Sequence, residues 1–346
     1  MPSGKSKNVT LKDVAKRVGV SAMTVSRALS AKAHLVNPET AQRCRDVAAE
    51  MGYVPNLMAR SLRGEQLNTI VMFAEFISHH HYLAELVDVT SRSIERRKYS
   101  VISCQSLLSF HQTLRNFNLS GAVVIAPPEY FYADPYGERG IGPVNAPPTV
   151  LVHSANEQND FSEVSPDISA FNYHASCHLF ELGHKHVGYI GGPRPDDQPH
   201  WFDLRQRGIT RAMDESGLPK ENLHHQPCPD ASTAPAALQQ LLTKFPKTTA
   251  VMCINDEIAI ASVAGARKLG LTVPKDLSVV GCNNIYLAKF FRPTLTTLAI
   301  DIPAMVDTAL DLLFDELRSD SVTDPIKIGL PANLIVRDST SPPPHR

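Results

Sequence analysis

The segment from Thr10 to Leu29 constrains this chain most, because it has the pattern of two short helices joined by a glycine turn. Its first half places apolar residues at i, i+3, i+4 and i+7, one face of a helix: Leu11, Val14, Ala15 and Val18. Thr10 followed by Asp13 predicts a capped start, and Gly19 accepts the left-handed backbone that ends a helix. Ser21 is then expected to cap the second helix.

The second helix has an apolar side and an outward side. Val25, Ala28 and Leu29 are expected to face inward. The remaining residues are expected to face outward: Ala22, Met23, Thr24, Ser26 and Arg27. Such a pair of helices is typical of a helix-turn-helix, whose second helix fits the major groove of DNA. A plain helical hairpin is the alternative from these residues alone.

Charge is unevenly distributed along the chain. Residues 1–64 hold 11 Lys and Arg against 4 Asp and Glu, whereas the remainder holds 23 against 31. A basic head with net charge +7 on an acidic body suits a polyanionic partner for the head only. Together with the two-helix pattern, this asymmetry favours DNA binding over a plain hairpin.

Size and composition bound the remaining possibilities. A chain of 346 residues is long enough for two or three domains, and a hydrophobic content of 43% supports a large core. We expect no membrane span, because no run of about 18 apolar residues occurs. The N-terminus lacks a secretory signal pattern, so cytoplasmic localisation is expected. Six cysteines without a CxxC pair indicate free thiols rather than a disulfide or zinc framework.

A third helix is predicted to complete an all-α headpiece over residues 1–55. Asn37 caps it, Pro38 stands at its first position and Gly52 ends it, after a loop over residues 30–36. Its inner face is expected to comprise Cys44, Val47, Ala48 and Met51. Residues 56–68 are predicted to form a linker with a short hinge helix.

The body, residues 69–338, alternates short apolar strands with amphipathic helices such as Leu83–Arg97 and Ala304–Leu317. The strands expected are Thr69–Ala74, Ser100–Cys104, Gly121–Ile125, Val150–Val152, His186–Ile190, Ala250–Ile254 and Ser278–Gly281. This alternation predicts an α/β fold with parallel sheets covered on both faces. Residues 127–148 are expected to form a long surface loop, and residues 339–346 a flexible tail.

Several motifs resemble one known family. They are DVAKRVGVSAMTVSRAL, NPETAQRCRDVAAEMGYVPNLMARSLRG, LFELGHKHVGYIGG, DLSVVGCNN and FRPTLTTLAID. Together they resemble the LacI/GalR family of bacterial transcription regulators over nearly the whole chain. The resemblance implies a body like that of periplasmic binding proteins, with two parallel-sheet subdomains hinged around a cleft. It places the first subdomain at residues 69–161 and 294–321 and the second at 162–293 and 322–338. The implied crossings lie near Phe161, Pro293 and Val322.

The resemblance also implies a set of DNA-contacting residues. These are Thr10, Ser21, Ala22, Met23, Thr24, Ser26, Arg27, Asn37, Asn56, Ala59, Arg60 and Leu62. Ala22 and Met23 occupy base-reading positions but can only contact thymine methyl groups or shape, whereas Arg27 suits a base edge or a phosphate. Leu62 matches the family's leucine that enters the minor groove. Two copies are needed, so a homodimer on a near-palindromic operator is expected, and the absence of a leucine-heptad tail favours dimer over tetramer.

A small-molecule effector is expected in the cleft of the body. The resemblance implies contacts from His81, Tyr82, His153, Trp201, Arg205, Asn255, Asp256 and Asn283. Arg205 matches an arginine that clamps hydroxyl or carboxylate groups. Asn283 stands where the family usually has an aspartate, and Ile300 where a polar residue is frequent. A cationic pocket without that carboxylate favours a sugar acid over a neutral sugar.

Two other classes of protein share some of these features. The body alone would suit a periplasmic solute receptor, but the basic head and the missing signal argue against that. The run His79–His81 invites a metal or hydrolase interpretation, yet adjacent residues point in different directions, and no HExxH, P-loop or GxSxG motif occurs. We therefore expect a transcription regulator, not an enzyme, without a metal or cofactor.

Overall fold

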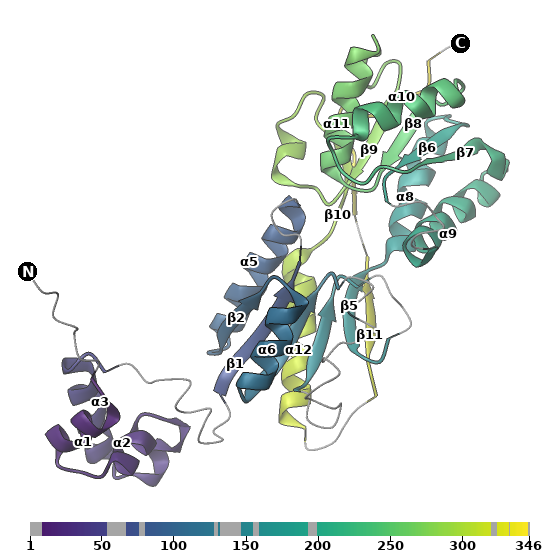
Figure 1. Ribbon diagram of the computed structural model, residues 1–346. Helices are drawn as coiled ribbons and strands as arrows, with labels where there is room; N and C mark the ends of the chain where they lie inside the picture. Colours follow the sequence, from purple (N-terminus) through teal and green to yellow (C-terminus); the bar gives the residue numbers. More distant parts are fainter. Residues whose placement is uncertain are drawn as a thin grey trace, which may run out of the picture. The chain divides into compact units, whose positions relative to one another are not determined.

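The headpiece is a three-helix unit whose helix starts are capped by side chains. The computed structural model describes residues 9–53, 67–75, 80–127, 131, 147–154, 159–192, 199–319, 324–331 and 333–344; for residues 31, 32 and 199–203 it describes the backbone only. The headpiece contains α1 (Leu11–Val18), α2 (Ala22–Ala28) and α3 (Pro38–Glu50). Residues 9–53 and the body are described separately below, as two compact units (Figure 1).

The predicted caps are confirmed. Thr10 and Asp13 form a reciprocal pair before α1, with the Thr10 N–H donating to Asp13 Oδ2 at 2.9 Å. Gly19 ends α1 with φ +79°, a left-handed conformation that favours glycine. Ser21 Oγ accepts from the Thr24 N–H at 3.0 Å, and Asn37 Oδ1 accepts from the Glu39 N–H at 3.0 Å. These bonds satisfy N–H groups that have no partner inside their helices.

The headpiece core differs from the predicted one in two details. Ala41 is fully packed on α3 although it was not anticipated, whereas Val47 and Met51 are only partly buried at the edge of the core. The loop expected over residues 30–36 contains a 3-10 helix, η1 (Ala31–Leu35). This correction reflects backbone bonds such as Ala33 N–H to Ser30 O, which the side-chain pattern did not indicate.

Six strands form the first sheet of the body, sheet A, in the order β11-β5-β4-β3-β1-β2. Its strands are β1 (Leu67–Ala74), β2 (Ser100–Cys104), β3 (Leu119–Ile125), β4 (Thr149–Val152), β5 (Ser162–Pro166) and β11 (Lys327–Leu330). The pairings β1–β2, β3–β4, β4–β5 and β5–β11 are parallel.

A second six-stranded sheet, sheet B, has the order β12-β10-β9-β8-β6-β7. Its strands are β6 (Val187–Ile190), β7 (Leu223–Gln226), β8 (Ala250–Cys253), β9 (Ser278–Cys282), β10 (Thr296–Ala299) and β12 (Asn333–Ile335). All its pairings are parallel except β10–β12, which is antiparallel. Two mostly parallel sheets confirm the predicted α/β body, although β5, β7 and β10–β12 were not anticipated.

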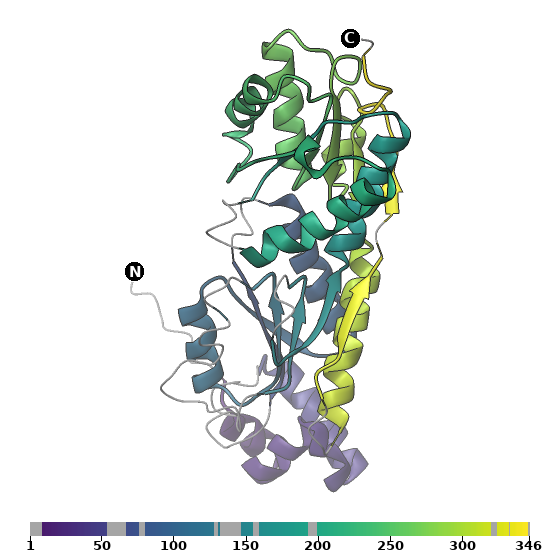
Figure 2. The ribbon, with the colours of Figure 1, turned by 90° about the vertical axis from the view of Figure 1, so that its right-hand side faces the viewer.

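Helices cover both faces of each sheet (Figures 1 and 2). On sheet A these are α5 (His81–Arg96) and α12 (Ile302–Arg318) on one face and α6 (Leu107–Asn116) on the other. On sheet B they are α8 (Ile168–Glu181) and α9 (Pro199–Glu215) on one face and α10 (Ala234–Lys244) and α11 (Asp256–Lys268) on the other. The body also contains the 3-10 helices η4 (Lys220–Asn222) and η5 (Tyr286–Lys289).

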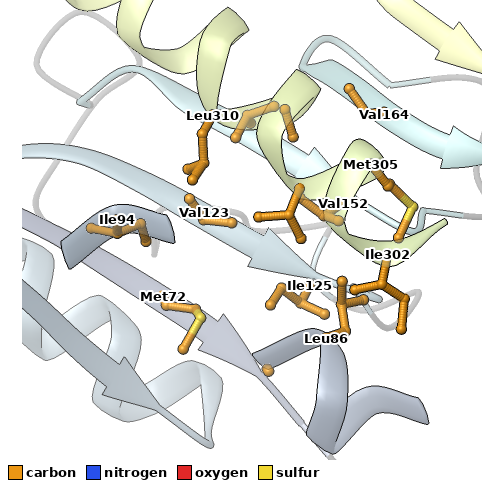
Figure 3. Packing of buried hydrophobic residues seen from close by; sticks show 14 of the residues in the cluster. Met72, Leu86, Ile94, Val123, Ile125, Val152, Val164, Ile302, Met305 and Leu310 are labelled. Carbon is orange, nitrogen blue, oxygen red and sulfur yellow. The ribbon is translucent and has the colours of Figure 1, made fainter. Parts of the chain in front are cut away.

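The alternation of strand side chains explains this layering. In β1, Ile70 and Met72 pack under α5 and α12, whereas Val71 and Phe73 pack against α6 on the opposite face. Figure 3 shows the first of these cores, where Met305 and other side chains of α12 meet side chains from the strands of sheet A. Strands buried on both faces read as continuous apolar runs, which is the pattern that predicted parallel sheets.

The chain crosses between the two sheets later than expected. β5 still belongs to sheet A, β10 still belongs to sheet B, and β11 returns to sheet A before β12 joins sheet B. The crossings therefore follow Pro166, Ala299 and Leu330, and the expected positions near Phe161 and Pro293 are wrong; Val322 lies outside the described residues. The expected boundaries missed the short strands β5, β10 and β11, which pair before the chain changes sheet.

The described part of the C-terminal segment is packed rather than flexible. Ser339 is fully buried; its hydroxyl donates to Val279 O at 2.6 Å and accepts from the Thr296 N–H at 2.8 Å. Ser341 N–H donates to Ser278 Oγ at 3.0 Å. The flexible tail expected from residue 339 onward is therefore wrong up to Ser341, because its hydroxyls bond to sheet B. Most of residues 127–148 lies outside the described residues.

Helices long and apolar enough to span a bilayer do not occur among the described residues.

Gly208 permits a close contact between α8 and α9. A Cβ at this position of α9 would lie 2.0 Å from Ser169 O and 2.8 Å from Tyr173 N, both backbone atoms of α8. We expect Gly208→Ala to destabilise the protein by about 3 kcal/mol, because neither backbone atom can move without separating the helices. Urea denaturation measures this change. Gly329→Ala is the matched control, since its nearest atom would be Asp167 Cβ at 3.8 Å; an equal effect of both changes would contradict the assignment.

Candidate functional site

The outward face of α2 is accessible, as a DNA-reading helix requires. The Met23 side chain is 63% exposed, Arg27 is exposed, and Ser26 is partly exposed. Thr24 Oγ1 lies 2.9 Å from Ser21 Oγ, so the two hydroxyls share a hydrogen bond at the start of the helix. Ala22 departs from the expected orientation, because it also packs against the headpiece core.

The other candidate DNA contacts fall into two groups. Thr10, Ser21 and Asn37 are exposed caps at the starts of α1, α2 and α3, where N–H groups favour an approaching phosphate. The hinge residues expected to contact DNA lie outside the described residues: Asn56, Ala59, Arg60 and Leu62, together with Arg63.

The body contains a cavity of about 180 Å³ at the carboxyl ends of strands from both sheets. Of the expected effector contacts, five line it: Tyr82, His153, Arg205, Asn255 and Asn283. Ile300 also lines it. The cavity thus lies where ligands bind in α/β folds, outside the carboxyl ends of the strands.

Three cavity residues adopt left-handed backbone conformations without being glycine. Ala126 has φ +44°, His153 has φ +58° and Asn283 has φ +100°. They directly follow β3, β4 and β9, respectively. Such conformations are sparsely populated for residues with a Cβ and gather at ligand sites, where the surrounding structure holds them.

His153 and Tyr82 form a neutral hydrogen-bonding pair on the side of sheet A. Tyr82 Oη lies 3.0 Å from His153 Nδ1, and the two rings are tilted with centroids 5.0 Å apart. Burial, together with the positive charge of Arg205, lowers the pKa of His153 to about 4. Burial raises the pKa of Tyr82 well above its usual value. At neutral pH this wall of the cavity therefore carries no charge from either residue.

Arg205 supplies positive charge on the side of sheet B. It lies on α9, one turn before Gly208, and hydrogen-bonds to Tyr189 of β6. Within the described part of the chain, no other Lys or Arg lines the cavity. The close contact of α9 with α8 at Gly208 fixes the position from which the guanidinium enters the cavity.

Asp256 does not face the cavity, contrary to expectation. Its carboxylate is fully buried and accepts hydrogen bonds from Thr297 Oγ1 at 2.6 Å and from the Ile285 N–H at 2.8 Å. Burial raises the pKa of this carboxyl to about 7. Asp256 therefore ties α11 to β10 and to the segment before η5, while the preceding Asn255 caps α11 and lines the cavity.

Two more of the expected effector residues are not placed in the cavity wall. His81 does not line the cavity; its N–H donates to Glu257 Oε1 at 3.1 Å. The backbone of Trp201 lies in α9, but its side chain is outside the described part of the structure.

Sequence reasoning also missed residues that line the cavity. Asn172 lies on the buried face of α8, where an amide among apolar residues is the signal that could have found it; its Nδ2 donates to Ile168 O at 2.8 Å. Glu257 directly follows the Asn255–Asp256 pair and supplies a carboxylate. The cavity wall includes the thiols of Cys253 and Cys282, and burial raises the pKa of each to about 12, so both remain protonated.

Comparison with known proteins agrees with the two-part architecture. The family model described as "Bacterial regulatory proteins, lacI family" matches residues 10–56, and one described as "Periplasmic binding protein-like domain" matches residues 177–340. The "HTH-type transcriptional repressor PurR" of Pectobacterium atrosepticum is 30% identical over 350 residues, covering 97% of this chain and 98% of the relative. The protein of that name from Yersinia pestis is 29% identical over 348 residues, with the same coverage.

Solved structures share the fold. A lac repressor dimer bound to operator and the anti-inducer ONPF superposes with a TM-score of 0.79 at 22% identity, over 97% of this chain and 100% of that chain. A complex of the transcriptional regulator CelR with cellobiose has a TM-score of 0.68 at 23% identity, over 96% and 99% of the two chains.

The buried Asp256 carboxyl generates a pH prediction. In the folded protein it holds its proton up to about pH 7, whereas the ordinary value is 3.8. The folded state therefore binds more protons between these values, so the contribution of Asp256 to the free energy of unfolding falls as pH rises from about 4 to about 7. We expect the free energy of unfolding of the wild type to fall relative to Asp256→Asn across this window, by at most about 1.4 kcal/mol per pH unit, and to stay level above it.

Urea denaturation at stepped pH values measures the difference between the two proteins. Asp324→Asn, a change of an exposed aspartate, is the control and is not expected to reproduce the pH dependence of Asp256→Asn. A wild-type protein that gains stability relative to Asp256→Asn as pH rises would contradict the assignment.

Proposed function

Because the chain belongs to the lacI family of bacterial regulatory proteins, we propose that it is a sequence-specific DNA-binding transcriptional repressor controlled by a small metabolite. The family consists of regulators rather than enzymes, and the relatives compared above are named as transcriptional repressors. In this proposal the protein works in the cytoplasm, where its headpiece binds an operator. The observation that carries the proposal is the pairing of an exposed α2 face with a cavity-bearing α/β body.

DNA recognition is proposed to use both readout and charge. α2 enters the major groove, where Ala22 and Met23 contact thymine methyl groups and Arg27 contacts a base edge or phosphate. Thr24 and Ser26 contact the DNA backbone. The helix caps Thr10, Ser21 and Asn37 add further phosphate contacts. Residues 1–64 carry a net charge of +7, which supports binding that weakens as salt rises. From the hinge, Leu62 enters the minor groove beside Ala59, while Asn56 and Arg60 contact phosphates.

The proposed DNA-bound form is a homodimer on a near-palindromic operator, as in the lac repressor dimer bound to operator. An exposed apolar cluster on η5 is the proposed contact with the second copy. Tyr286 is 74% exposed, Leu287 48% and Phe290 58%, and the rings of Tyr286 and Phe290 lie 4.7 Å apart. Exposed aromatic clusters of this kind are typical of protein interfaces rather than of free surfaces.

The proposed effector is a small anionic metabolite, with a sugar acid favoured over a neutral sugar. Arg205 offers a fork of donors suited to a carboxylate, while the amides of Asn172, Asn255 and Asn283 suit hydroxyl groups. Because His153 is neutral, its ring can accept or donate a hydrogen bond to the effector. It adds no charge that would favour or disfavour a charged effector. Calorimetric binding of a neutral sugar, with no binding by any sugar acid tested, would remove this preference.

The DNA-binding proposal predicts which part of the chain is needed. A duplex is first selected from a randomised palindromic pool by repeated binding to the full chain. In a mobility-shift assay we expect this duplex to be bound by the full chain and not by a chain lacking residues 1–64. Arg27→Ala is expected to weaken binding about 10-fold, within the range for one base contact. Arg92→Ala, on α5 of the body, is the control.

The same assay distinguishes the two roles of Arg27. A base contact predicts a loss confined to particular base pairs, whereas a phosphate contact predicts a uniform loss and a salt slope reduced by about 1. Equal binding by the full chain and the truncated chain would overturn the DNA-binding proposal.

The dimer proposal predicts that a charge on η5 separates the copies. We expect Leu287→Glu combined with Phe290→Glu to shift the protein to monomer in sedimentation velocity and to weaken operator binding, because the two charges would be buried without partners. Lys289→Glu places a charge on the same exposed helix outside the apolar cluster and is expected to leave the dimer intact. A double variant that sediments as a dimer would exclude this surface.

A further inference from the structure

We propose that Glu257 is a specificity-determining residue for the effector, and that the effector presents an N–H donor, best an ammonium group, to its carboxylate. The inference rests on the proposed function and deepens it, because it adds a second polar requirement to the anionic group held by Arg205. The juxtaposition that carries it is a cavity-lining carboxylate with one oxygen bound across the cleft and the other accepting no hydrogen bond from the described residues.

Glu257 lies in the first turn of α11, on sheet B, and lines the cavity. Its side chain is only 14% exposed. Oε1 accepts from the His81 N–H at 3.1 Å and lies 3.3 Å from His81 Nδ1, and His81 is the first residue of α5, which covers sheet A. One oxygen of this carboxylate therefore joins the two subdomains.

The second oxygen has no such role. Glu257 Oε2 is shielded from solvent and accepts no hydrogen bond from any residue that the structure describes. A buried carboxylate oxygen without a donor is costly, by about 1–3 kcal/mol or more. Glu257 lines the cavity, and a rotation of its carboxyl group that exposes Oε2 there would let a ligand in the cavity supply the missing donor.

The charges in the cavity wall define the class of ligand. Arg205 is positive and Glu257 negative, while His153 and Tyr82 are neutral at pH 7. A purely anionic ligand satisfies the guanidinium and leaves the carboxylate oxygen without a donor. An amino-bearing carboxylate, such as an amino sugar acid, satisfies both groups, and a charge-assisted hydrogen bond is the stronger kind.

The same carboxylate connects ligand binding to the arrangement of the subdomains. An ammonium group of the ligand would donate to Oε2 of Glu257. The other oxygen of the same carboxylate accepts from His81, on the opposite side of the cleft. A ligand shifts a conformational equilibrium only through contacts that differ between the two states. Glu257 provides such a contact, because its bond to His81 exists only while the two subdomains stay together.

The test uses four probe molecules: one with an amine and a carboxylate, one with the carboxylate only, one with the amine only, and one with neither. They are 2-amino-2-deoxy-D-gluconate, D-gluconate, D-glucosamine and D-glucose, titrated calorimetrically into the full-length dimer. We expect the wild type to bind each amine at least about 10-fold more tightly than its hydroxyl counterpart, the contribution of one charge-assisted hydrogen bond. Glu257→Gln retains an acceptor for His81 and replaces Oε2 by a donor, so the amine preference is expected to disappear.

Two further variants keep the result interpretable. Glu95→Gln removes an exposed negative charge on α5 and is expected to retain the amine preference. Glu257→Asp keeps the charge on a shorter side chain and is expected to retain part of the preference. Cooperative thermal unfolding of each variant verifies that it is folded.

The outcomes separate the inference from the proposed function. An amine preference that persists in Glu257→Gln, no preference in the wild type, or no binding of either amine at millimolar concentration each overturns the inference. Operator mobility shift, without a probe and with each probe in turn, tests the proposed function independently. If operator binding occurs in any of these conditions while the amine preference is absent, only the inference fails; if operator binding is absent in all of them, the proposed function fails.

Discussion

The parallel direction of the strands is the constraint on which the body depends. Parallel strands need helical crossovers, so each sheet is covered on both faces and each strand ends at the same edge. In both sheets these edges face one cavity, where His153 follows β4 and Asn283 follows β9. The left-handed backbone at both positions turns the chain directly after the strand and leaves their side chains at the cavity wall. The location of the candidate site thus follows from the topology before any side chain is considered.

A buried carboxylate connects several elements at this edge of sheet B. Asp256 accepts from Thr297 on β10 and from the backbone before η5, and a Cβ on Gly281 would lie 2.1 Å from its Oδ1. The absence of that Cβ is therefore what allows the carboxylate to reach both donors. The same bonds hold the Asp256 carboxylate away from the cavity wall, although the adjoining Asn255 lines the cavity.

The sequence predicted those features that depend on local chemistry. Thr10, Ser21 and Asn37 were identified as caps because their side chains satisfy nearby N–H groups, and seven strands were found as apolar runs. β7 was missed because it is a short, mostly polar edge strand, and β12 because it is an edge strand of only three residues. Glu257 was missed because its role depends on His81, 176 residues away in the chain, and no local pattern encodes that contact.

The distribution of cavity residues over the two sheets limits how an effector can act. Tyr82 and His153 belong to the subdomain of sheet A, whereas Arg205 and Asn283 belong to that of sheet B. In the proposed regulation, a ligand that contacts only one of these pairs binds an open and a closed arrangement of the subdomains equally and shifts nothing, however tightly it binds. A ligand that spans both pairs binds the closed arrangement better, and that difference in affinity is the largest change in operator affinity it can produce. Ligand size and the placement of its polar groups at both ends therefore matter more to regulation than affinity alone.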